Sequence, residues 1–104
     1  MAVRMITQSK NLYAFLEGEI DHHTAASLRT VIDDALVQGC PKELVMDFSG
    51  VTFMDSSGIG LVMGRYKTAL AQNCKVRVIN VSDRDMRVMK MSGLGKIVEF
   101  GRTV

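Results

Sequence analysis

The stretch of sequence that decides the fold is LVMDFSGVTFMDSSGIG, residues 44–60. It opens with a short and mostly apolar run, 44–48, of the length of a buried β-strand. Ser49-Gly50 then indicates a turn, and an acid, two serines and two glycines follow. Beyond them, apolar residues recur at helical spacing, at Ile59, Val62, Met63, Tyr66 and Leu70. This stretch therefore predicts a strand that leads through a loop into a helix beginning near Ser56 or Ser57.

Upstream of this unit, the pattern predicts two strands and a helix. Residues 3–7 and 12–17 read as short strands with a hairpin turn between them. Asp21 is a natural N-cap for a helix, and Gly39 is expected to end that helix as its C′ residue, with Pro41 just beyond. The expected apolar stripe of this helix is Leu28, Val31, Ile32, Ala35 and Leu36.

Downstream, the pattern predicts a strand, a helix and a last strand. The strand covers 75–81, the helix is capped by Ser82 with Asp85 at the capping-box position, and the final strand covers 97–100. The expected order is β-β-α-β-α-β-α-β. Right-handed crossovers place the helices on one face of the sheet if successive strands advance in one direction. The sequence thus predicts a two-layer α/β domain with a mixed sheet of four to five strands and helices mainly on one face.

Length, charge and composition are those of a single small globular domain. The 104 residues are one domain's worth, and 13 basic and 11 acidic residues are too balanced for a nucleic-acid-binding surface. No signal peptide is visible near Met1, and no apolar run is long enough for a membrane helix. Cys40 and Cys74 form no CxxC motif and are expected to be reduced and buried. We expect a cytoplasmic protein that binds neither nucleic acid nor membrane.

The segment 53–60 carries the chemistry. A helix N-terminus presents unpaired N–H groups and the positive end of a dipole. A phosphate attached to a serine there would be held by those N–H groups. From the local pattern alone, a simple N-cap also explains Ser56 or Ser57, and tight packing also explains Gly58 and Gly60.

Four blocks of sequence carry a resemblance to a known family. They are GEIDHHTA at 18–25, FMDSSGIG at 53–60, GRYK at 64–67 and MSGL at 91–94. In order and spacing they resemble the bacterial anti-sigma factor antagonists of the SpoIIAA type, which are STAS domains. The likeness covers nearly the whole chain, and the combination of the first two blocks is highly specific. The resemblance implies a single STAS-like domain over 1–104, with no catalysis of its own and neither cofactor nor metal.

The resemblance also implies a switching mechanism. The unphosphorylated protein binds an anti-sigma factor that is also a serine kinase, of the SpoIIAB type, and so releases a sporulation-type sigma factor, sigma-F. The kinase phosphorylates the serine after the motif aspartate, here Ser56, and a PP2C-type phosphatase restores the protein. Ser57 corresponds to the neighbouring hydroxyl that the family does not use as its main acceptor. The free protein is expected to be a monomer.

Two segments are expected to form the partner surface. One is Asp21, His22 and His23, which should lie near the Ser56 loop. The other comprises Asp55, Ser56, Ser57, Gly58 and Ile59. For the first segment, a helix cap and surface histidines are the simpler interpretation. Two adjacent histidines without a third ligand at useful spacing make a weak metal site.

Three alternatives stay open from the residues. Gly58-x-Gly60-x-x-x-Gly64 is reminiscent of a nucleotide-binding loop, but it departs from the dinucleotide fingerprint by one residue and has no Walker lysine. A serine hydrolase is disfavoured because Ser56 does not lie in GxSxG. Related STAS domains serve stress-response cascades, so the sigma factor could be of that kind instead.

Overall fold

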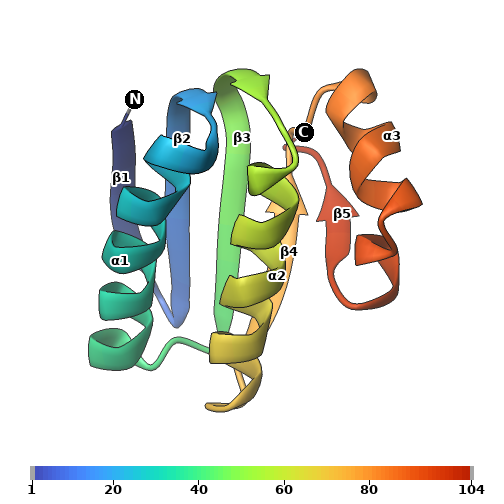
Figure 1. Cartoon of the computed structure of the whole chain (residues 1–104). Coiled ribbons are helices and arrows are strands. Elements are labelled where there is room, and N and C mark those ends of the chain that lie inside the picture. Colours follow the sequence, from blue (N-terminus) through green and yellow to red (C-terminus); the bar gives the residue numbers. More distant parts are fainter. Residues whose placement is uncertain (1, 104) are drawn as a thin grey trace.

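The computed structural model describes residues 2–103 as one mixed β-sheet with three α-helices (Figure 1). The strands are β1 (Ala2–Gln8), β2 (Asn11–Ile20), β3 (Glu43–Met54), β4 (Lys75–Ile79) and β5 (Glu99–Gly101). The helices are α1 (His22–Gly39), α2 (Ser57–Leu70) and α3 (Asp83–Met91), followed by the 3-10 turn η1 (Leu94–Lys96). The predicted element order and two-layer α/β class are confirmed.

The sheet topology explains why the helices share one layer. Its strand order is β1-β2-β3-β4-β5, with β1 antiparallel to β2 and the other neighbours parallel. Successive parallel strands advance in one direction, so right-handed crossovers lay α1 and α2 on the same face. Figure 1 shows these two helices side by side in front of the sheet, with α3 beside β5.

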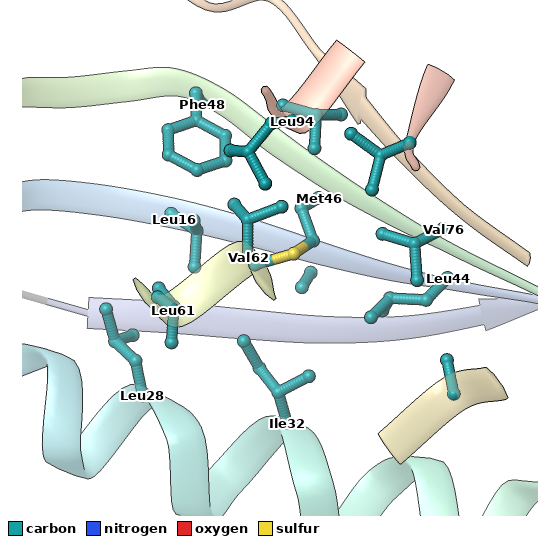
Figure 2. Packing of buried hydrophobic residues seen from close by; sticks show 14 of the residues in the cluster. Leu16, Leu28, Ile32, Leu44, Met46, Phe48, Leu61, Val62, Val76 and Leu94 are labelled. Atoms are coloured by element: carbon teal, nitrogen blue, oxygen red, sulfur yellow. The ribbon is translucent and has the colours of Figure 1, made fainter. Parts of the chain in front are cut away.

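The core lies between this helix layer and the sheet. Leu28 and Ile32 of α1 are fully buried and point toward Leu16 and Met46 of the sheet (Figure 2). Burial of such a side chain stabilises the fold by about 2 kcal/mol. The predicted stripe of α1 is confirmed at these positions and at Leu36, whereas Val31 is 42% exposed.

Strand β3 is longer than predicted. The turn expected at Ser49-Gly50 is wrong, because β3 continues to Met54. The parallel register between β2 and β3 shifts between Phe15 and Glu17, where β2 advances by two residues and β3 by three, from Asp47 to Gly50, which marks a bulge in β3. A Cβ on Gly50 would lie 2.8 Å from the Leu16 carbonyl oxygen. The glycine therefore permits two strands to approach at the bulge instead of turning the chain.

Three other boundaries differ from prediction. Helix α1 includes Gly39, and the left-handed residue after it is Cys40, whose φ is 42° and whose N–H donates to the Leu36 carbonyl at 3.0 Å. Strand β4 ends at Ile79, two residues early, and β5 is Glu99–Gly101 instead of 97–100. Ser82 caps α3 as predicted, because its hydroxyl accepts from the Asp85 N–H at 3.2 Å.

The two thiols differ in exposure. Cys74 is buried, and burial raises the pKa of its thiol. Cys40 is exposed, so the expectation that both cysteines are buried is wrong for this residue. It lies in the tight left-handed cap of α1, outside the core. Separately, no helix within 2–103 combines the length and apolar character needed to cross a membrane.

Candidate partner-binding site

The two segments predicted to form the partner surface meet at one edge of the sheet. They follow β2 and β3, which are parallel neighbours, so both begin at the same edge. Ile20 is paired with Met54 in the register, and the Asp55 N–H donates to the Ile20 carbonyl at 3.1 Å. The expectation that residues 21–23 lie near the Ser56 loop is confirmed.

Asp21 fixes the start of α1. Its carboxylate accepts hydrogen bonds from the N–H groups of His23 at 2.9 Å and Thr24 at 2.8 Å. In return, the Thr24 hydroxyl accepts from the Asp21 N–H at 2.9 Å, which closes a reciprocal capping box. The predicted cap is confirmed, and it leaves His22 and His23 exposed on the first turn. No cluster of three or more metal-ligating side chains occurs among the described residues.

The Asp21 cap should make the start of α1 sensitive to acid. The hydrogen bond from the Thr24 N–H is the largest factor that lowers the Asp21 pKa below its ordinary value of 3.8. A lowered pKa in the folded state means that the stabilisation is complete above pH 3.8 and is lost as the pH falls through the lower folded value. We expect the Thr24 amide resonance to titrate in that range, and Asp21→Asn to abolish the titration while keeping the helix start. A Thr24 titration that survives in Asp21→Asn would contradict this assignment.

Ser56 does not cap α2. It occupies the position before the helix with φ −60° and ψ −16°, and its side chain makes no cap hydrogen bond. Asp55 takes that role instead, because its carboxylate accepts from the Ser57 N–H at 2.8 Å. The simple N-cap interpretation therefore fails for both serines. Ser56 is exposed, whereas Ser57 is only partly so.

The backbone N–H groups at this helix start are largely engaged. The Gly58 N–H donates to the Asp55 carbonyl at 3.0 Å, and the Ile59 and Gly60 N–H groups donate to the Ser56 carbonyl at 3.1 and 3.3 Å. The expectation that these groups would hold a phosphate is therefore wrong for residues 57–60. A phosphate on Ser56 would still experience the positive end of the helix dipole.

The glycines of α2 serve two different purposes. A Cβ on Gly58 would overlap the buried side chain of Met54, so this glycine is required by internal packing. A Cβ on Gly60 or Gly64 would meet no atom within 4 Å. Each of these two costs the helix about 1 kcal/mol relative to alanine. Packing among residues 2–103 therefore does not account for that cost.

A groove of about 410 Å³ runs between α1 and α2 from the Ser56 loop. His22 and Ser57 line one part of it, and Arg29, Gly60 and Gly64 line its walls further along. It therefore touches both predicted segments. Sequence reasoning did not assign Arg29 or the two glycines to this surface, because only the packed pair of helices brings them together.

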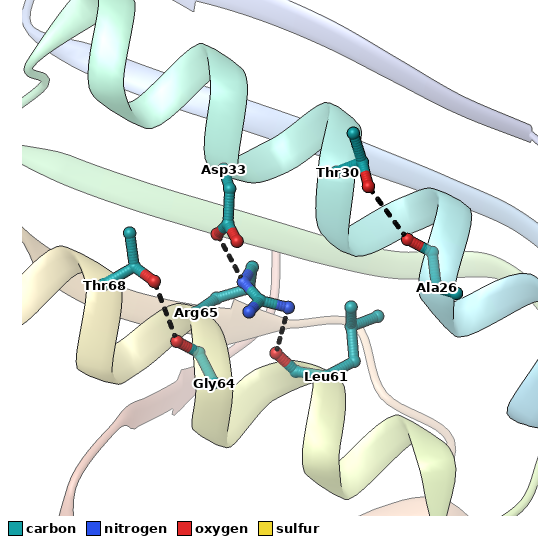
Figure 3. Close-up of polar contacts among 7 residues, drawn as sticks. All are labelled: Ala26, Thr30, Asp33, Leu61, Gly64, Arg65 and Thr68. Carbon is teal, nitrogen blue, oxygen red and sulfur yellow. Dashed lines mark hydrogen bonds and ion pairs between the residues drawn. The ribbon is translucent and has the colours of Figure 1, made fainter.

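Arg65 joins the two helices beneath this groove. It is 5% exposed, and its Nε lies 2.7 Å from the Asp33 carboxylate (Figure 3). One terminal nitrogen donates to the Leu61 carbonyl at 3.4 Å. Burial lowers the pKa of Arg65, and the neighbouring Asp33 opposes that shift. The buried residues of α2 are 58, 61, 62, 65 and 69. Leu70, which the sequence pattern placed on the apolar side of this helix, is 58% exposed.

Comparison with known proteins identifies the family. The STAS domain model matches residues 2–104. An anti-sigma F factor antagonist of Paenibacillus polymyxa is 37% identical over 83 residues, 80% of this chain and 71% of that protein. An anti-sigma-B factor antagonist of Listeria monocytogenes is 32% identical over 89 residues, 83% of this chain and 75% of the relative.

Solved structures agree. The anti-sigma factor antagonist SpoIIAA in its unphosphorylated form has a TM-score of 0.85 and 31% identity, covering 99% of this chain and 89% of that one. The Bacillus SpoIIAA in the phosphorylated form has a TM-score of 0.78 at the same identity, covering 99% and 92%. The chain belongs to the STAS domain family and, within it, to the anti-sigma factor antagonists.

Proposed function

We propose that this chain is a phosphorylation-controlled switch that binds an anti-sigma factor with serine kinase activity, releasing a sigma factor of the sporulation type, sigma-F. Residues 1–104 act as one STAS domain without catalysis of their own. The kinase phosphorylates Ser56, and a PP2C-type phosphatase removes the phosphate. The surface that meets the partner comprises Asp21, His22 and His23 together with residues 55–59.

The observation that carries this proposal is the state of Ser56. Its hydroxyl is exposed and makes no cap hydrogen bond, because Asp55 caps the helix. A kinase can therefore modify this oxygen without breaking a structural contact. The existence of SpoIIAA structures in phosphorylated and unphosphorylated forms supports a phosphorylation cycle for a relative 31% identical to this chain.

The switch works locally. Phosphorylation adds about −1.5 to −2 charges next to Asp55. Within an interface that charge and bulk weaken binding directly, and about 1.4 kcal/mol already changes affinity tenfold. No refolding is needed, so spectra of the two forms should differ mainly around Ser56.

The test is phosphorylation by the cognate anti-sigma factor with ATP, followed by mass spectrometry of the wild type, Ser56→Ala and Ser57→Ala. We expect one phosphate on the wild type and on Ser57→Ala, and none on Ser56→Ala. Ser56→Asp, which mimics part of the charge, should weaken binding to the anti-sigma factor by about tenfold or more. Ser57→Ala is the matched control, since it removes the adjacent hydroxyl.

Each contrary result has a distinct meaning. A phosphate that disappears only in Ser57→Ala would move the site by one residue and keep the mechanism. No phosphate on any form, with a kinase that is active on another substrate, would refute the phosphorylation switch. A release of ATP-derived phosphate by the chain alone would instead favour an intrinsic nucleotide-binding activity.

The alternative to sigma-F is a sigma factor of the stress-response type. It rests on the 32% identity to an anti-sigma-B factor antagonist, which favours a stress-response module. The same fold and the same Ser56 would then serve a different anti-sigma factor. Binding assays against an anti-sigma F and an anti-sigma-B factor in parallel would decide between the two.

A further inference from the structure

The feature that calls for explanation is the pair of glycines at 60 and 64 in the middle of α2. Gly60 and Gly64 are one helical turn apart and both line the groove between α1 and α2. Glycine disfavours a helix relative to alanine, yet a Cβ at either position would meet no atom within 4 Å. Close packing of α2 against α1 therefore does not require them. The empty space above them lies on the outside of the molecule.

Within the part of the chain that the structure describes, the groove is lined by one unpaired cationic side chain, Arg29. Arg29 and His22 line it as exposed side chains, and Arg29 forms no ion pair with any residue in 2–103. Arg65 also lines it while almost fully buried. Its Nε lies 2.7 Å from the Asp33 carboxylate, so the charge of Arg65 already has a partner within the protein. A carboxylate in the groove would therefore meet the exposed guanidinium group of Arg29.

We infer that the α1–α2 groove seats a helix of the anti-sigma factor that carries acidic side chains, its backbone lying against Gly60 and Gly64 and a carboxylate facing Arg29. This inference rests on the proposed function and extends its contact surface from the Ser56 loop along α2. Glycines without side chains let another backbone approach closely. A groove between two helices accommodates a third helix, and the unpaired Arg29 favours a helix that carries a carboxylate at that point.

The inference predicts stability and binding effects of opposite sign. In Gly60→Ala and Gly64→Ala the melting temperature should rise, because alanine favours the helix and meets no neighbour. The affinity of each unphosphorylated variant for the anti-sigma factor should fall about tenfold, because the added methyl group fills the space that the partner's backbone would occupy. Titration calorimetry with the anti-sigma factor and thermal unfolding of the same samples give both readouts.

A matched control is available in the same chain. Gly95 lies in η1, far along the sequence from the groove, and a Cβ there would make an ordinary 3.8 Å contact with the Phe100 ring. Gly95→Ala should therefore leave the affinity unchanged. Arg29→Glu tests the charge: it should weaken binding about tenfold or more and make the remaining binding less sensitive to salt.

The outcomes separate this inference from the function beneath it. If the wild type binds the anti-sigma factor and both glycine variants bind it equally well, the inference about the groove is wrong and the proposed function stands. A loss of affinity accompanied by a lower melting temperature would also overturn it, because the glycines would then serve internal packing. A wild type that does not bind the anti-sigma factor would refute the proposed function itself.

Discussion

Replacing Asp33 with alanine should lower the free energy of unfolding by about 3 kcal/mol, because it leaves the buried guanidinium of Arg65 without its counter-charge. The Arg65 side chain is 6% exposed and its Nε lies 2.7 Å from the Asp33 carboxylate. Water cannot replace the carboxylate at so buried a position. Urea unfolding of Asp33→Ala against the wild type measures the loss.

Removal of the other partner should cost much less. In Arg65→Met the charge left behind is on Asp33, which is 30% exposed and can be hydrated. The methionine also retains most of the apolar stem of the arginine. We expect Arg65→Met to lose about 1 kcal/mol, and the double variant with Asp33→Ala to be close to the wild type. If Arg65→Met were the more damaging single change, packing of the arginine stem, not its charge, would hold the helices together.

Ile20→Ala should destabilise the protein by about 3 kcal/mol, within the usual range for buried isoleucine. The side chain is 0% exposed and lies at the end of β2, paired with Met54 at the end of β3. Its carbonyl accepts the Asp55 N–H, so the same residue anchors both segments of the candidate site. A cavity here should also speed hydrogen exchange of the Asp55 amide, which NMR can follow.

The conservative change at the same position supplies the control. Ile20→Val removes one methylene and should cost about 1 kcal/mol, with little change at the Asp55 amide. Equal losses for valine and alanine would mean that the site collapses around the smaller residue. In that case Ile20 would not be the anchor that its burial indicates.

Local patterns were sufficient to predict the architecture. Helical spacing identified α1 and α2, and the capping residue Asp21 was correctly placed because a cap depends on neighbours within three residues. The crossover rule then placed the helices on one face and brought residues 21–23 to the Ser56 loop. Each of these steps uses short-range chemistry or chain topology.

Features that depend on distant contacts were not predictable from the sequence. Ser49-Gly50 has the composition of a turn, and only the pairing of Gly50 with Glu17 of β2, at a bulge in β3, shows that Gly50 lies within a strand. The sequence pattern indicated Ser56 or Ser57 as the cap of α2, whereas the structure has Asp55 in that role. Both residue types are good caps, and the loop geometry decides between them.

Arg65 illustrates the same limit within one helix. It shares a face with Leu61 and Val62, but an arginine in that position is normally exposed. Its burial depends on Asp33, which lies on a different helix, α1. The apolar positions predicted a face centred on residues 59, 62, 63, 66 and 70, whereas the buried face of α2 is displaced from it and includes Arg65, which pairs with Asp33.

The cap provided by Asp55 also bears on protein lifetime in the cell. Because the Ser56 hydroxyl contributes no hydrogen bond to the helix start, a group attached to it leaves that cap intact. Degradation by proteases depends on how often a protein opens. Loss of the helix cap therefore gives proteases no reason to prefer the phosphorylated form, and the ratio of the two forms should follow the kinase and the phosphatase.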